Sequence, residues 1–223
     1  MKFIVFNGSP AKENSATNVI AKAFLEGAQK AGAEYENIFL LDKNIGHCKG
    51  CFACWFKTPG KCVVQDDMAE LLLKYTSADV VCFGTPVYTW NMTAALKNFA
   101  DRLAPLKSPL IVQKEGNFDL KDAHKKEQKF VVISNCGFPG ENNFETMRVV
   151  FQSCNPVLEI YRNCGKLLKS KDEAVQEIVS EYLKAVEQAG FELASKRAVT
   201  DETKKKLEMQ LMTVPAYVKY LGM

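Results

Sequence analysis

The most chemically distinctive stretch of the sequence is CKGCFACWFKTPGKC, residues 48–62. It holds four of the eight cysteines of the chain in the pattern C-x2-C-x2-C-x7-C, namely Cys48, Cys51, Cys54 and Cys62. Three thiolates at this spacing can bind one side of a cubane iron–sulfur cluster, and the fourth can complete the ligand set after a short excursion. Pro59 and Gly60 would turn the chain back toward the first three. The spacing therefore favours a [4Fe–4S] cluster.

Zinc and disulfides are the two other uses of these cysteines. Structural zinc sites usually take two separated C-x2-C pairs, whereas Cys51 would be shared between both pairs here. Disulfides persist in oxidising compartments, and residues 1–8 lack the apolar segment of a secretory signal. No stretch approaches the ~18 apolar residues of a membrane span, so we expect a cytoplasmic protein without a membrane partner. A disulfide is thereby disfavoured, zinc fits less well, and free thiols stay open.

Composition and periodicity favour one α/β domain over residues 1–223. The net charge of +3, from 29 basic and 26 acidic residues, gives no electrostatic argument for a nucleic-acid partner. Apolar runs and helical spacings alternate along the chain, which predicts a parallel sheet with helices on both faces. A polar, irregular excursion is expected over 114–128, and Asp66 or Asp67 should cap a helix. The expected strands are 2–6, 34–41, 79–85, 129–134 and 157–162, and the expected helices 14–30, 66–75, 91–103, 143–153, 172–189 and 201–212.

The first strand leads into a helix through NGSPAKENSATN, residues 7–18. Such a turn directs backbone N–H groups and the positive end of the helix dipole at one spot, which favours a phosphate. One glycine is too few for a dinucleotide fingerprint or a Walker loop, but Ser9, Ser15 and Thr17 offer neutral hydroxyl donors. An ordinary helix capped by Asn14 or Ser15 explains the same residues equally well.

Two later loops also follow predicted strands. In GTPVYTWN, residues 84–91, Pro86 stiffens the turn, Tyr88 and Trp90 could stack on an aromatic ring, and the backbone of 87–91 could bind its polar edge. Ligands of open α/β sheets lie at such carboxyl ends. The alternative is that the two aromatics merely flank a helix start. In SNCGFPGENNFE, residues 134–145, the glycines and proline could be turn residues only.

These segments resemble the flavodoxin-like NAD(P)H-dependent FMN reductases. Gly8-Ser9-Pro10 followed by Asn14-Ser15-x-Thr17-Asn18 is similar to the loop that holds the FMN phosphate in that family, although Ala11-Lys12-Glu13 departs from the usual basic pair. Pro86-Val87-Tyr88 with Leu96-Lys97-x-Phe99-x-Asp101-Arg102 resembles the family's isoalloxazine loop and following helix. The resemblance implies a flavodoxin-like, doubly wound sheet of five parallel strands. It also implies FMN contacts from Ser9, Pro10, Asn14, Ser15, Thr17, Asn18, Pro86, Val87, Tyr88, Thr89, Trp90, Asn91, Cys136 and Gly137.

The cysteine segment, loop 47–65, is similar to the compact motif of the iron–sulfur flavoproteins, a branch of the same group, and Asp66-Asp67-Met68 also matches. The resemblance implies that Cys48, Cys51, Cys54 and Cys62 ligate a [4Fe–4S] cluster. Lys49, Lys57 and Lys61 could offset its charge, or form a solvated basic loop. The leading hypothesis is an FMN-dependent oxidoreductase that passes electrons between a reduced donor, FMN and the cluster. A cluster-free NAD(P)H-dependent FMN or quinone reductase, a flavodoxin-like electron carrier and a metal-stapled structural module are the alternatives.

The expected partners also follow from the resemblance. They are NAD(P)H as a co-substrate, a small-molecule or ferredoxin-like electron donor, and a second chain in a homodimer or a dimer of dimers. Similarity covers roughly residues 1–165, and the helices expected over 172–212 carry no motif. The apolar tail 214–221 could serve an interface or pack on its own domain. No residue is assigned a catalytic acid–base role, including His47 and His124.

Overall fold

A computed structural model describes residues 1–114, 116–124 and 126–222 of the chain. Its main sheet has five strands in the order β2-β1-β3-β6-β7, and each pairing between neighbours is parallel. This is the predicted doubly wound, flavodoxin-like arrangement, with β1 at the point where the strand order reverses. The strands are β1 (Lys2–Asn7), β2 (Glu34–Phe39), β3 (Val80–Pro86), β6 (Lys129–Asn135) and β7 (Leu158–Arg162).

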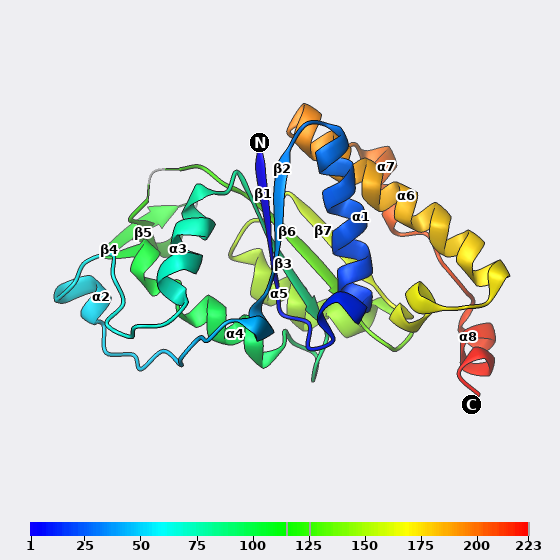
Figure 1. Ribbon diagram of the computed structural model, residues 1–223, viewed down its shortest axis with the longest axis horizontal. Helices are drawn as coiled ribbons and strands as arrows, with labels where there is room; N and C mark the ends of the chain where they lie inside the picture. Colours follow the sequence, from blue (N-terminus) through cyan, green and yellow to red (C-terminus); the bar gives the residue numbers. More distant parts are fainter. Residues whose placement is uncertain (115, 125, 223) are drawn as a thin grey trace.

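Helices cover both faces of this sheet, as Figure 1 shows. One face carries α1 (Ala16–Lys30), α6 (Glu173–Lys196) and α7 (Asp201–Leu207), and the other carries α3 (Met68–Ser77), α4 (Ala94–Asp101) and α5 (Glu145–Gln152). The central strands β1, β3 and β6 are buried along nearly their whole length. Their near-continuous apolar runs are therefore explained by a sheet that is covered on both sides.

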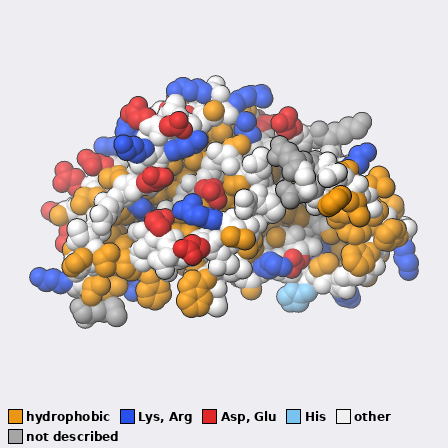
Figure 2. All heavy atoms as spheres, turned by 180° about the vertical axis from the view of Figure 1, so that it is seen from behind, with side chains coloured by type: hydrophobic (Ala, Val, Ile, Leu, Met, Phe, Trp, Pro, Cys, Tyr) orange, Lys and Arg blue, Asp and Glu red, His pale blue; other side chains and the backbone are white. Residues whose placement is uncertain are grey.

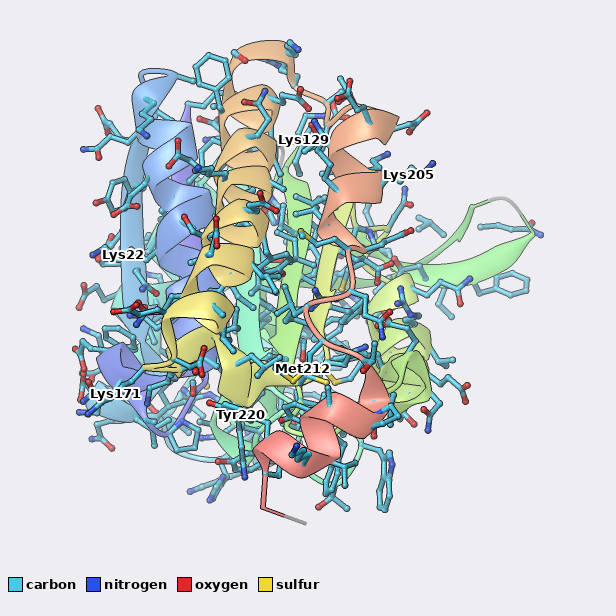
Figure 3. The ribbon with its side chains drawn as sticks, turned by 90° about the vertical axis from the view of Figure 1, so that its right-hand side faces the viewer. Lys22, Lys129, Lys171, Lys205, Met212 and Tyr220 are labelled. Atoms are coloured by element: carbon cyan, nitrogen blue, oxygen red, sulfur yellow. The ribbon has the colours of Figure 1, made fainter. Side chains whose placement is uncertain are left out.

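Helices α1 and α6 lie side by side, as the view in Figure 3 shows. Two glycines make their contact close. A Cβ atom added to Gly27 would lie 1.8 Å from the backbone oxygen of Glu187, and one added to Gly190 would lie 1.9 Å from that of Phe24. The two helix backbones therefore touch, and larger residues at these two positions are excluded by sterics.

The prediction of an irregular excursion over 114–128 was wrong for Lys114 and Asn117–Asp122, which lie in strands, and right for residues 123–124 and 126–128. Lys107–Lys114 and Asn117–Asp122 form an antiparallel hairpin, β4–β5, outside the main sheet, whereas residues 115 and 125 lie outside the described part of the chain. Ile111 and Phe118 are 74% and 75% exposed on this hairpin. Leu110-Ile111-Val112 in β4 and the alternation of Phe118 and Leu120 with polar residues in β5 are the signals that could have identified these strands.

Helix boundaries also differ from the prediction at several places. The helix expected over 91–103 begins at Ala94, and those expected over 66–75 and 143–153 begin at Met68 and Glu145. The helix expected over 172–189 continues to Lys196, because its buried stripe extends to Leu193. The helix expected over 201–212 ends at Leu207, and α8 (Val214–Tyr220) follows in the apolar tail. Tyr217 of α8 is fully buried, so the tail packs on its own chain.

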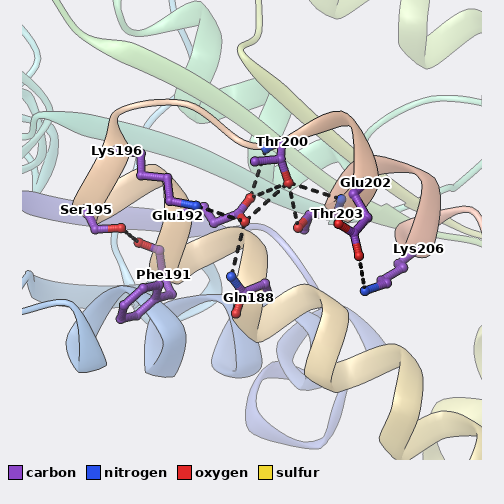
Figure 4. A network of polar contacts seen from close by, with 9 residues as sticks. All are labelled: Gln188, Phe191, Glu192, Ser195, Lys196, Thr200, Glu202, Thr203 and Lys206. Atoms are coloured by element: carbon purple, nitrogen blue, oxygen red, sulfur yellow. Dashed lines mark hydrogen bonds and ion pairs between the residues drawn. The ribbon is translucent and has the colours of Figure 1, made fainter.

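A buried carboxylate fixes the turn between α6 and α7 (Figure 4). Glu192 accepts hydrogen bonds from Gln188 Nε2 at 3.1 Å, Thr200 N at 2.9 Å and Thr200 Oγ1 at 3.0 Å. Burial opposes ionisation, but the hydrogen bonds outweigh it and lower the pKa of Glu192 to about 2.

None of the described helices is long and apolar enough to cross a membrane.

Candidate functional site

The loops that follow β1, β3 and β6 meet at the carboxyl edge of the sheet and are joined by hydrogen bonds. Gly8 N donates to Gly84 O at 2.7 Å, and Val87 N donates to Asn135 O at 2.8 Å. The hydroxyl of Thr93 donates to Gly8 O at 2.7 Å and caps α4 by accepting from Leu96 N. The structure therefore brings together the three loops that the sequence predicted as a ligand site.

In the first loop, Ser15 is the helix cap. Its hydroxyl accepts from Asn18 N at 2.9 Å and donates to Lys12 O at 2.7 Å. The first turn of α1 carries no acidic residue, so the positive end of this 15-residue helix is not neutralised from within. Pro10 and Asn14 are exposed beside it. The helix start can accept an anion through its remaining backbone N–H groups.

The other predicted donors of this loop are turned inward. Thr17 is fully buried and donates to Asn135 Oδ1 at 2.6 Å, which ties α1 to the end of β6. Asn18 Oδ1 accepts from Asn37 at 2.7 Å, and the side chain of Ser9 is buried. Because the hydroxyls of Ser15 and Thr17 already donate within the protein, they position the loop, and backbone N–H groups remain for an anion.

The second loop contains a strained two-residue turn. Tyr88 and Asn91 exchange backbone hydrogen bonds of 2.8 and 3.0 Å, and between them Thr89 and Trp90 have φ angles of 48° and 58°. Two successive positive φ angles are typical of a type I′ turn, which normally requires glycine or asparagine. Strain of this kind is concentrated at ligand sites. Tyr88 and Trp90 are 54% and 62% exposed, so both rings are available to a planar ligand.

The third loop is held by two hydrogen bonds, one from the thiol of Cys136 and one from the hydroxyl of Tyr217. The thiol of Cys136 is buried and donates to Phe138 O at 3.2 Å, and burial raises its pKa to about 11. Cys136 is therefore a neutral thiol near pH 7 that faces the interior. Gly137 is exposed, and its carbonyl accepts a hydrogen bond of 2.7 Å from the hydroxyl of Tyr217 in α8.

Sequence reasoning missed Thr93, Asn135 and Tyr217. Thr93 carried a usable signal, because a threonine before a helical run is a preferred cap. Asn135 carried a weaker one, as the polar residue that ends a buried strand. Tyr217 lies 80 positions from Gly137 and carried none.

The cysteine motif lies on a loop with a closed neck. Asn44 N donates to Asp67 Oδ2 at 2.7 Å, and Gly46 N donates to Asp66 Oδ2 at 2.8 Å. Asp66 also accepts from Met68 N, so it serves the start of α3 as predicted. Beyond the neck, the short helix α2 (Ala53–Phe56) is fixed where Trp55 Nε1 donates to Ala104 O at 2.8 Å.

The four cysteines are near one another without forming a completed ligand cage. Cys48 and Cys51 are exposed, whereas Cys54 and Cys62 are half-buried. Burial raises the pKa of Cys54, and the nearby charges of Cys62, Cys48 and Cys51 add to this effect. Within the described residues, no group of three or more His, Cys, Asp or Glu side chains is placed to hold a metal ion. The donor chemistry fits a thiolate-ligated cluster, but the arrangement would have to contract around it.

The cysteine loop lies away from the first of the three sheet-edge loops. Figure 1 shows α2 beside β4 and β5 at one end of the molecule, away from the start of α1. In Figure 2, apolar side chains gather at that same end. The large exposed apolar residues of α2, the cysteine loop and the hairpin are Phe52, Phe56, Val63, Leu110, Ile111 and Phe118.

Comparison with known proteins places these features in a family. The sequence model of the NADPH-dependent FMN reductase family matches residues 1–124. An iron-sulfur flavoprotein of Archaeoglobus fulgidus is 41% identical over 102 residues, which are 46% of this chain and 48% of that protein. One from Methanocaldococcus jannaschii is 40% identical over 107 residues, which are 48% of this chain and 54% of that protein. The chain thus matches about half the length of these curated relatives.

The fold has solved counterparts. An FMN-dependent NADH-azoreductase from Bacillus anthracis, solved in complex with FMN, superposes with a TM-score of 0.62 at 18% identity, over 86% of this chain and 99% of that chain. At this identity the likeness concerns the fold alone. Together with the family match over residues 1–124, the sheet topology and the joined loops, it leads to one conclusion: the chain belongs to the NADPH-dependent FMN reductase family.

Proposed function

We propose that this protein is an FMN-dependent oxidoreductase that binds FMN across the three loops at the carboxyl ends of β1, β3 and β6. The observation that carries the proposal is that hydrogen bonds hold these loops together at one edge of the sheet. An uncompensated helix start and a strained aromatic turn are fixed together through the hydrogen bond from Thr93 to Gly8. An anionic group and a planar ring at opposite ends of one ligand suit these two features.

Each part of the chain would have a defined task. Backbone N–H groups at the start of α1 would bind the FMN phosphate, while Ser15 and Thr17 hold that loop in shape. Tyr88, Trp90 and the backbone of residues 87–91 would border the isoalloxazine ring. When bound, FMN supplies hydride and single-electron transfer, and the protein supplies its position and surroundings. Reduced nicotinamide and a small-molecule or ferredoxin-like carrier are the proposed electron donors.

We further propose that Cys48, Cys51, Cys54 and Cys62 hold a [4Fe–4S] cluster. Support comes from the spacing, from the placement of all four thiols on one loop with a closed neck, and from the relatives named iron-sulfur flavoproteins. When bound, such a cluster supplies single-electron transfer. Helix α2 of the cysteine loop lies away from the start of α1 (Figure 1), so we also propose a homodimer or dimer of dimers in which neighbouring chains approach each other's sites. Light scattering on the purified protein tests this assembly.

A cluster-free NAD(P)H-dependent FMN or quinone reductase is the second candidate. The observation that favours it is the match of residues 1–124 to the sequence model of the NADPH-dependent FMN reductase family. The two candidates differ in composition, since one contains iron and acid-labile sulfide and the other does not.

The deciding experiment is anaerobic purification followed by measurement of iron, acid-labile sulfide and FMN per chain. The proposed function predicts about four iron, four sulfide and one FMN. The double variant Cys48→Ser/Cys51→Ser should lose iron and keep FMN. The matched control Cys154→Ser, which alters another exposed cysteine outside the motif, should keep both. FMN without iron in the unaltered protein selects the second candidate, and protein without FMN refutes both.

A further inference from the structure

We propose that Arg102 is the positioning residue of the cysteine motif, which fixes the Cys62 sulfur and places a cation beside the metal cluster that this sulfur would bind. The inference rests on the proposed function, because it assumes a cluster on the four cysteines. Arg102 comes directly after α4, and its side chain is 1% exposed. It lies at the neck of the cysteine loop, between Gly46 and Asp66.

The geometry of the guanidinium accounts for this role. Nη1 donates to Gly46 O and to Asp66 Oδ2, both at 2.6 Å. Nη2 donates to Asp66 Oδ1 at 3.0 Å and to Cys62 Sγ at 3.4 Å. The Arg102 side chain therefore binds Gly46 before loop 47–65, Asp66 after it, and Cys62 within it. A planar fork with donors in fixed directions can make these contacts together, and an ammonium group cannot.

The electrostatics of the pair indicate more than a structural clamp. Burial opposes the charge on Asp66, but the hydrogen bonds from Arg102, Gly46 and Met68 outweigh it and lower the pKa of this carboxyl. The two charges are therefore retained in the interior, where desolvation makes an ion pair no better for stability than apolar side chains of similar size. Among the described residues Arg102 Nε has no hydrogen-bond partner, so the guanidinium is not fully satisfied by the contacts at the neck.

A thiolate-bound cluster would use this arrangement. Four thiolates give an iron–sulfur cluster a net negative charge, and hydrogen bonds to its sulfurs raise its reduction potential by stabilising the added electron. Within the described part of the chain, Cys62 is the cysteine of the motif whose sulfur receives a guanidinium hydrogen bond. Arg102 should therefore seat the fourth ligand and raise the potential.

The test replaces the buried ion pair by neutral amides, in the double variant Arg102→Gln/Asp66→Asn. Its matched control is Lys97→Gln/Asp101→Asn, which makes the same chemical change in an exposed ion pair of 2.6 Å on the same helix. A third variant, Arg102→Lys, keeps the charge and removes the fork. Each protein is purified anaerobically, iron, sulfide and FMN per chain are measured, and the cluster potential is determined by redox titration followed by electron paramagnetic resonance.

We expect the buried-pair variant to keep one FMN per chain and to have either a more negative cluster potential or at least a twofold loss of iron, while the control matches the unaltered protein. Unchanged iron and potential in the buried-pair variant would overturn the proposal. If that variant loses FMN and iron together through misfolding, Arg102→Lys decides: a potential below that of the unaltered protein supports the role, and an equal one overturns it. Absence of iron from the unaltered protein itself would instead refute the proposed cluster, and the inference with it.

Discussion

The hydrogen bond between Thr93 and Gly8 provides a direct test of how the flavin loops are held together. In Thr93→Val the side chain keeps its shape and loses its hydroxyl. Loss of the helix cap should lower the free energy of unfolding by about 1 kcal/mol. The variant also loses the buried hydrogen bond of 2.7 Å to Gly8 O. The carbonyl that is left unpaired should lower the free energy of unfolding by a further ~1–3 kcal/mol. We therefore expect a total loss of about 2–4 kcal/mol.

The matched control is Thr213→Val at the start of α8. Thr213 also caps its helix with a bond of 3.4 Å, but it is exposed and its hydroxyl makes no second hydrogen bond within the described residues. Urea unfolding of FMN-free protein should show a loss of about 1 kcal/mol for this variant. Titration with FMN should show about tenfold weaker binding for Thr93→Val, equivalent to 1.4 kcal/mol, and unchanged binding for the control. Equal losses of stability in the two variants would refute the reasoning.

Three further outcomes are expected. Gly190→Ala should lower the free energy of unfolding by more than about 3 kcal/mol, because its new methyl group would overlap Phe24 O at 1.9 Å, and a loss below 1 kcal/mol in urea unfolding would contradict the packing of α1 on α6. Glu192→Gln should remove the part of the unfolding free energy that depends on the ionised carboxylate of Glu192. Because the pKa of Glu192 is about 2 in the folded protein and near 4.5 in the unfolded chain, this part is about 3 kcal/mol above pH 4.5 and disappears as pH falls toward 2. Between pH 7 and pH 3, the free energy of unfolding should therefore change less with pH in the variant than in the unaltered protein. Trp55→Phe removes the hydrogen bond to Ala104 O, so the local stability of α2 should fall by about 1 kcal/mol. Hydrogen exchange of the α2 amides should therefore become about fivefold faster, while exchange in α1 should not change.

Several parts of the fold were predictable because the information is local. The buried strands could be recognised from apolar runs, since a strand covered on both faces carries apolar residues at nearly every position. Val80–Pro86 is one such strand. Ser15 could be recognised as a cap from its place before a helical spacing. Each of these signals lies within a few residues of chain.

The hairpin β4–β5 shows where local patterns fail. Its strands pair with each other outside the main sheet, and they are short, with charged residues on either side of Leu110-Ile111-Val112 and of Phe118. The extent of α6 could not be predicted either, because its last turns pack against segments that are distant in sequence. Tertiary burial determined these boundaries, which propensity alone does not fix.

By itself, the sequence determined the five strands of the main sheet, the loops that follow β1, β3 and β6, and the types of donor that those loops carry. Only the tertiary structure decided which of those donors are free. Thr17 is committed to Asn135, 118 positions away, and Arg102 reaches Asp66 and Cys62, 36 and 40 positions away. The physical reason is that a hydrogen bond between distant segments depends on how the sheet brings them together, and chain spacing carries no record of that geometry.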